Sequence, residues 1–168
     1  MEDAVFGLSQ TGVAHVTCGL LALTLGAVVV TMPKGTRRHR RVGQAYVTAM
    51  VLLNGTGLFM HRFNGGFGPF HVFVLISLAT LAAGFIPVYL RRPRHAWMTT
   101  HAIFMAWSYV GLVAALAAEI AVRLPGARLA PSVFVPTMAI MVIGGILIFT
   151  RVPRIIRRLT RGRPAPLA

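Results

Sequence analysis

Long apolar runs alternate with short blocks of arginine, glycine and proline along the whole chain. Each run is about 20 residues long, the length that an α-helix needs to cross a bilayer of roughly 30 Å. The pattern predicts an all-α integral membrane bundle of five transmembrane helices, forming a single domain over 1–168. The predicted helices cover residues 8–31, 42–62, 69–90, 96–122 and 131–150, and a basic tail follows at 151–168.

Basic residues are divided unevenly between the two predicted sides of the membrane. Fourteen lysines and arginines fall on one side, in loops 34–41 and 91–95 and in tail 151–163. The other side has three, which are Arg62, Arg123 and Arg128. Because cytoplasmic loops are enriched in Lys and Arg, we expect the N-terminus outside and the C-terminus in the cytoplasm. The expected partners of these arginines are the anionic lipids of the inner leaflet.

Composition excludes several classes of protein. The chain is 56% hydrophobic with a formal net charge of +14, which a basic nucleic-acid-binding domain would also show. Placement of the arginines between apolar runs argues against nucleic acid as a partner. Cys18 is the only cysteine, so neither a disulfide framework nor a zinc site of several thiolates is expected. The acidic first residues lack a basic n-region, which argues against a cleavable signal peptide.

Histidines and one glutamate are the candidate functional residues, because titratable groups at membrane depth are costly unless paired or liganded. At about 1.5 Å of rise per residue they fall into two groups. The outer group is His15, His61, His71 and Glu119, and the inner group is His101, His95 and His39.

The faces of the predicted helices say which of these groups point into protein. A small-residue stripe on the first helix contains His15, and such stripes mark faces buried between helices. The stripe is Gly12, His15, Gly19, Ala22 and Gly26. On the fourth helix, His101 and Glu119 are 18 residues apart, about five turns, and are expected on one buried face. On the third helix the stripe of Ser77, Thr80 and Gly84 leaves out His71, for which an interfacial position without further function is the alternative.

Three kinds of chemistry are compatible with these groups. Two imidazoles from facing helices ligate haem iron axially, and the absence of CxxCH predicts non-covalent haem b. Zinc or copper held by His15, His61, His71 and Glu119 is an alternative, although no HExxH or HxxxH spacing is present. A third is a proton or solute path lined by Glu119, His101 and Asn54.

The block KGTRRHRRVGQAYV at 34–47, preceded by His15 and followed by FGPFH at 67–71, resembles a bacterial family of small predicted membrane proteins of unknown function. The resemblance covers roughly residues 12–120 and implies location in the bacterial cytoplasmic (inner) membrane. A weaker likeness, in architecture only, is to haem-bearing membrane cytochromes of the b561 and ferric-reductase kind. Those proteins keep histidine pairs at both membrane faces, whereas this chain lacks two helices that each bear an inner and an outer histidine.

The preferred interpretation is a membrane protein that binds haem b or a metal and has a redox role. His15 and His71 would be the outer axial pair, with His61 and Glu119 beside them. The inner candidate is His101, with His95 or His39. The alternatives are a small proton-coupled transporter and an accessory subunit without chemistry of its own. The protein partners expected are a second copy of the chain or a membrane redox partner.

Overall fold

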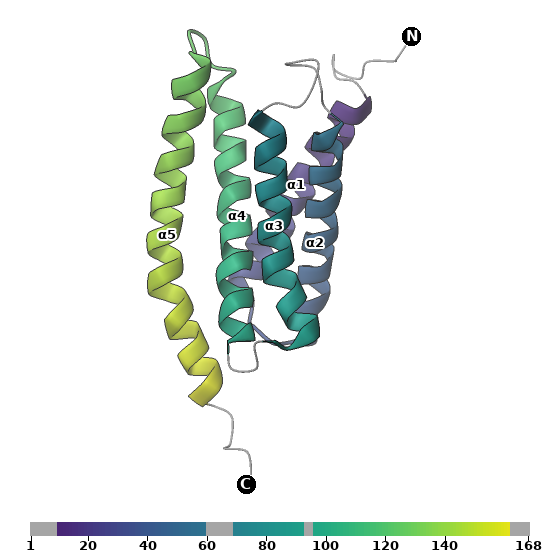
Figure 1. Ribbon diagram of the computed structural model, residues 1–168, viewed down its shortest axis with the longest axis vertical. Coiled ribbons are helices and arrows are strands. Elements are labelled where there is room, and N and C mark those ends of the chain that lie inside the picture. Colours follow the sequence, from purple (N-terminus) through teal and green to yellow (C-terminus); the bar gives the residue numbers. More distant parts are fainter. Residues whose placement is uncertain (1–9, 60–68, 93–95, 162–168) are drawn as a thin grey trace. The chain divides into compact units, whose positions relative to one another are not determined.

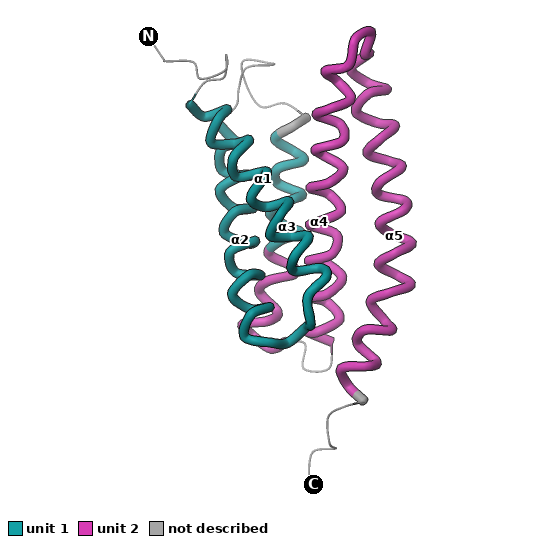
Figure 2. Tube along the Cα trace, turned by 180° about the vertical axis from the view of Figure 1, so that it is seen from behind, with its two compact units in different colours: residues 1–81 teal, residues 82–168 magenta. Residues whose placement is uncertain are grey.

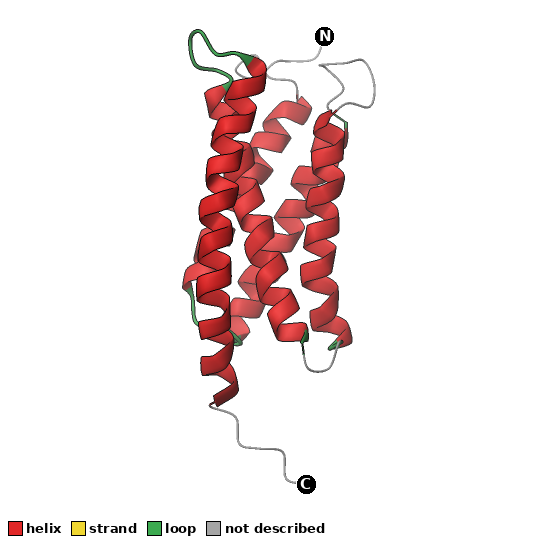
Figure 3. Ribbon diagram, turned by 60° about the vertical axis from the view of Figure 1, so that its left-hand side comes forward, coloured by secondary structure: helices red, strands yellow, loops and turns green. Residues whose placement is uncertain are grey.

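The computed structural model describes residues 10–59, 69–92 and 96–161, and every regular element within these ranges is an α-helix (Figures 1 and 3). The five helices of the described ranges are α1 (Gln10–Thr31), α2 (Arg37–Leu58), α3 (Pro69–Leu90), α4 (Trp97–Ala121) and α5 (Leu129–Arg161). Four of them are long and apolar enough to cross a membrane, and α2 is the exception. The prediction of an all-helical membrane protein is therefore confirmed.

Helix boundaries agree best where proline begins a helix, since α3 covers the predicted 69–90. Helix α2 begins at Arg37, five residues before the predicted start. Thr36 caps this end, because its hydroxyl accepts a hydrogen bond from the His39 amide at 3.0 Å. Helix α5 continues to Arg161, although a tail was predicted from residue 151. Arginine, isoleucine and leucine are good helix formers, so the helix does not end where the apolar run ends.

A lysine closes the turn between α1 and α2. Lys34 Nζ donates to the carbonyl oxygens of Val29 at 2.6 Å and Val30 at 2.7 Å, two of the last carbonyls of α1. A cation at this position also complements the negative end of the helix dipole. Partial burial lowers the pKa of Lys34 below its usual value. Gly35 follows with φ +79°, a conformation that glycine adopts without strain.

The chain divides into two compact units, shown in different colours in Figure 2. Unit 1 (1–81) contains α1, α2 and the first part of α3, and α1 packs against α2. Unit 2 (82–168) contains the rest of α3, α4 and α5, and α4 packs against α5.

Glycines allow the close approach of α4 and α5 in unit 2. A Cβ on Gly144 would clash with the Val110 side chain, and one on Gly145 would lie 3.2 Å from the Trp107 ring. Close backbone approach through small residues is the usual means by which membrane helices associate.

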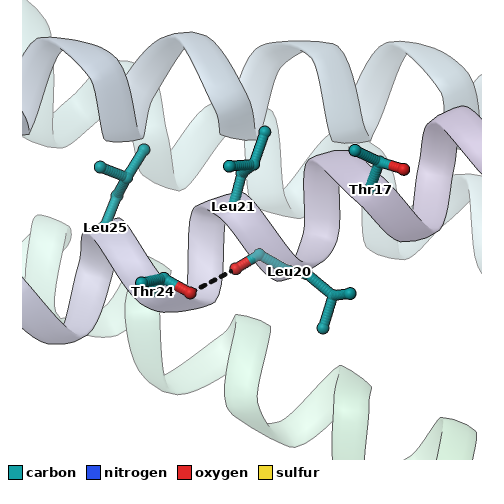
Figure 4. Close-up of a pocket in the computed structure, with 5 residues that line it drawn as sticks. All are labelled: Thr17, Leu20, Leu21, Thr24 and Leu25. Atoms are coloured by element: carbon teal, nitrogen blue, oxygen red, sulfur yellow. Dashed lines mark hydrogen bonds between the residues drawn. The ribbon is translucent and has the colours of Figure 1, made fainter.

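The outward faces of the helices are apolar, and their few hydroxyls are satisfied internally. Thr24 Oγ1 donates to the Leu20 carbonyl at 2.9 Å, as Figure 4 shows, and Thr80 and Thr150 make the same bond to the residue four positions earlier. These threonines are exposed or half-exposed, yet their hydroxyls need no water. A shallow pocket on this side of α1 is lined by Thr17, Leu20, Leu21, Thr24 and Leu25 (Figure 4). This surface is suited to lipid acyl chains.

Candidate histidine site

His15 is held by a hydrogen bond from α1 to α2. Its Nδ1 lies 3.0 Å from Thr56 Oγ1. The Thr56 hydroxyl already donates its proton to the Leu53 carbonyl at 2.8 Å, so it can only accept from the imidazole. His15 Nδ1 therefore carries a proton, and Nε2 is the basic nitrogen of the neutral ring. Histidines that ligate metals or haem iron through Nε2 are oriented in this way by a partner at Nδ1.

Gly57 brings α2 close to the His15 ring. A Cβ at this position would lie 3.5 Å from His15 Cε1 and 3.3 Å from Val74 Cγ2 of α3. His15, Gly57 and Val74 therefore meet at one level of unit 1, although they come from three helices. Even a methyl group at position 57 would be tightly packed between the imidazole and Val74.

His71 lies on the packed face of α3 and is only 6% exposed. Val74, which reaches Gly57, follows His71 by three residues, so the two side chains share one side of the helix. The same side continues through Leu81 and Gly84, which are also buried. The packed stripe of α3 therefore runs through His71 and not only through the small polar residues.

The small-residue stripe predicted on α1 is confirmed as a packed face. Gly12, Ala22 and Gly26 are buried, and His15 is half-buried on the same side. On α2, Met50 and Asn54 are among the buried residues.

His101 is held in a similar way to His15, within unit 2. Its Nδ1 lies 2.8 Å from the Gly84 carbonyl oxygen of α3. A carbonyl only accepts, so Nδ1 carries the proton and Nε2 is again the basic nitrogen. Helix α3 contains Pro87, which has no amide proton to donate, one turn after this carbonyl. The imidazole thus binds to α3 close to its interrupted turn.

Glu119 is not buried. Its side chain is 61% exposed and forms an ion pair with Arg123, Oε1 to Nη2, at 2.5 Å. Arg123 also donates to the Glu119 backbone carbonyl at 2.6 Å. The hydrogen bond to the Glu119 side chain raises the pKa of Arg123. The prediction that Glu119 shares a buried face with His101 is wrong, because this face of α4 is buried at Ser108 and Leu112 but exposed from Ala115 onward.

The other predicted site residues are described only in part. His39 is half-buried in the first turn of α2, where its amide completes the Thr36 cap. His61 and His95 lie outside the described residues. Within residues 10–59, 69–92 and 96–161, no group of three or more His, Cys, Asp or Glu side chains is placed to hold a metal ion. The zinc or copper hypothesis with His15, His61, His71 and Glu119 includes one residue beyond these ranges.

Sequence reasoning did not assign a role to the two residues that hold the imidazoles, nor to one large buried side chain. Thr56 and Gly84 hold the two imidazoles. Tyr46 is 2% exposed and is, with Met50, among the largest fully buried side chains. A signal was available for Tyr46, because it belongs to the KGTRRHRRVGQAYV block, but none distinguishes Thr56 from the lipid-facing threonines.

The fold and the site together define a polytopic helical membrane protein with histidines packed between its helices. The chain belongs to the family described as Predicted membrane protein (DUF2306), whose model matches residues 12–156. No curated protein and no solved structure matches the chain.

Proposed function

We propose that the chain binds haem b through His15 and His71 and acts as a membrane redox protein. The observation that carries this proposal is the hydrogen bond from His15 Nδ1 to Thr56 Oγ1, since it makes Nε2 the ligating nitrogen. A six-coordinate haem between two imidazoles would supply one-electron transfer inside the membrane.

The contacts of His15 lead to the second proposed ligand. Gly57 lets His15 of α1 and Val74 of α3 both approach α2 closely. His71 is buried on the side of α3 that faces the same glycine through Val74, about one turn away. Both histidines therefore belong to one end of unit 1, where α1 and α3 begin and α2 ends.

We further propose that α2 crosses the membrane as the fifth span. Its 22 residues are long enough, at about 33 Å. It is joined to α1 by the turn at 32–36 and bonded to it again at the far end, from Thr56 to His15. A helix that accompanies a membrane-crossing neighbour along its whole length crosses with it. The proposed orientation keeps the basic turn and the end of α5 in the cytoplasm of a bacterial cell.

A transporter with Glu119, His101 and Asn54 in its path has less support. Glu119 is exposed and paired with Arg123. The Asn54 amide donates to the Met50 carbonyl of its own helix at 2.7 Å. Two of the three residues are therefore engaged locally.

The test is a set of alanine variants purified in detergent, with haem quantified by its visible spectrum. His15→Ala and His71→Ala should each remove the bis-imidazole haem, whereas Cys18→Ala, one turn along α1 and equally half-buried, should retain it. Free imidazole added to His71→Gly should restore the spectrum. Full haem content in both alanine variants would overturn the proposal, and stoichiometric zinc or copper in place of haem would move the same imidazoles to metal chemistry.

A further inference from the structure

Two methionines accompany His101 on the first two turns of α4. Met98 precedes His101 by three residues and Met105 follows it by four. Residues at these spacings lie on one side of a helix, and positions seven apart differ by only about 20°. Nitrogen and thioether ligands are thus presented together from a single helix.

We propose that Met98, His101 and Met105 form a copper(I) site in unit 2. The part of it that the structure shows most directly is the convergence of His101 and Met105 on Gly84. His101 Nδ1 binds the Gly84 carbonyl, and a Cβ on Gly84 would lie 2.9 Å from Met105 Sδ. The imidazole and the thioether therefore lie against the same residue of α3.

The orientation of His101 suits coordination. The Gly84 carbonyl fixes the proton on Nδ1 and makes Nε2 the basic nitrogen. Such a bond to a ligating histidine is the usual support of a metal site. The methionine side chain has three rotatable bonds, which let Met98 and Met105 reach an ion near the imidazole from one turn on either side.

The ligand types select the metal. Thioethers are soft ligands that favour copper(I). Zinc would need further imidazoles, thiolates or carboxylates, and calcium or magnesium would need oxygen ligands, none of which belong to this set of one imidazole and two thioethers. Glu119 is the only acidic residue in the described parts of the chain, and it lies 18 residues from His101, about 27 Å along α4.

This site is independent of the haem proposed at His15 and His71. It competes with the predicted use of His101 as an inner haem ligand, because Nε2 cannot ligate both. It is also consistent with the finding that no cluster of His, Cys, Asp and Glu side chains is present in the described ranges, since two of its three ligands are methionines.

The experiment titrates the purified full chain with copper(I), without oxygen and against a chromogenic copper(I) chelator. We expect one equivalent to bind, and Met98→Leu and Met105→Leu each to weaken binding more than ~10-fold. Met138→Leu, on the exposed side of α5 in the same unit, is the matched control and should bind as the wild type does. Silver(I) should compete with copper(I), and zinc(II) should not.

The methionine variants carry the test, because His101→Gln also removes the bond to Gly84 and can perturb folding. Leucine keeps the volume of methionine, and the haem content attributed to His15 and His71 should stay unchanged in both variants. Wild-type copper affinity in the Met98→Leu, Met105→Leu double variant would overturn the proposal. Loss of a haem signal in His101→Gln at wild-type thermal stability would also overturn it, in favour of an inner haem.

Discussion

His15 and Thr56 are 41 residues apart in the sequence, and His15 Nδ1 lies 3.0 Å from Thr56 Oγ1. The bond joins the beginning of α1 to the end of α2, and it decides which imidazole nitrogen can act as a ligand. Since the threonine hydroxyl is itself committed to the Leu53 carbonyl, the direction of the bond is fixed. The proposed function depends on this relationship more than on any other.

Removing the acceptor should therefore weaken the site without deleting a ligand. Thr56→Val keeps the shape of the side chain but leaves His15 Nδ1 without this partner. We expect haem affinity to fall about 10- to 100-fold, the usual effect of losing such a support. Haem titration of the apoprotein measures it. Thr56→Ser keeps the hydroxyl and should bind as the wild type does, so equal losses in both variants would contradict the assigned role.

Gly57 should not tolerate a large side chain, because His15 Cε1 and Val74 Cγ2 already lie within 3.5 Å of the place of its Cβ. Gly57→Leu would displace the His15 imidazole and should lower haem content severalfold. Gly55→Leu is the matched control, because a Cβ at Gly55 meets nothing within 4 Å. The comparison uses haem per protein and the thermal midpoint of each variant. Equal haem content in the two variants would show that the close packing at Gly57 does not position His15 as a ligand.

Two glycines in unit 2 should respond in opposite directions to alanine. Gly84→Ala brings a Cβ to 3.0 Å from the Met105 backbone nitrogen, and overpacking of this kind costs about 1–3 kcal/mol. Gly111→Ala meets nothing within 4 Å and should stabilise α4 by about 0.5–1 kcal/mol, because alanine loses less backbone entropy. Thermal unfolding in detergent measures whether each variant is less or more stable than the wild type. A stabilised Gly84→Ala protein would contradict the close approach of α3 and α4 in this unit.

Lys34 should stabilise the turn between α1 and α2. Lys34→Met removes hydrogen bonds to the Val29 and Val30 carbonyls and a cation from the end of a helix dipole. The expected loss is about 1–3 kcal/mol, with increased amide exchange at the end of α1. Arg37→Met, at an exposed position three residues later, should change stability by less than about 0.5 kcal/mol. Similar losses in the two variants would mean that charge alone is responsible.

Glu119→Gln should change neither haem content nor, by more than about 0.5 kcal/mol, stability. The carboxylate is 61% exposed and its ion pair with Arg123 lies at the surface, where such pairs contribute little. Loss of a bound metal or of haem in this variant would restore Glu119 to the site.

The apolar runs predicted the number of helices because each run is separated from the next by proline, glycine or arginine. They predicted α3 best, since Pro69 begins it and Arg91, with φ 47°, ends it. They did not predict the end of α5. Charged residues such as Arg151 mark where the chain leaves the membrane, but a helix ends only where its backbone hydrogen bonds end. Helix α5 therefore continues past Arg151 to Arg161.

The sequence indicated which residue types belong to the candidate histidine site, but it did not indicate which residues contact them. The stripe around His15 could be read from the sequence, because small residues recur at helical spacing. The partners Thr56 and Gly84 could not, because they depend on how two helices are aligned along their axes. The burial of His71 could not be predicted, because its packed neighbours, Val74 and Leu81, are apolar and look like lipid-facing residues. The expected burial of Glu119 was wrong, because a polar residue that shares a helix face with His101 can still lie where that face is exposed.

The most direct test of the haem proposal is the visible spectrum of the wild-type protein, purified in mild detergent from cells supplied with haem. Spectra are recorded oxidised and after dithionite reduction, with metal analysis of the same sample. The account predicts a Soret band and sharp α and β bands on reduction, with at least one haem b per chain. A colourless sample without haem, metal or haem-binding capacity on titration would contradict it.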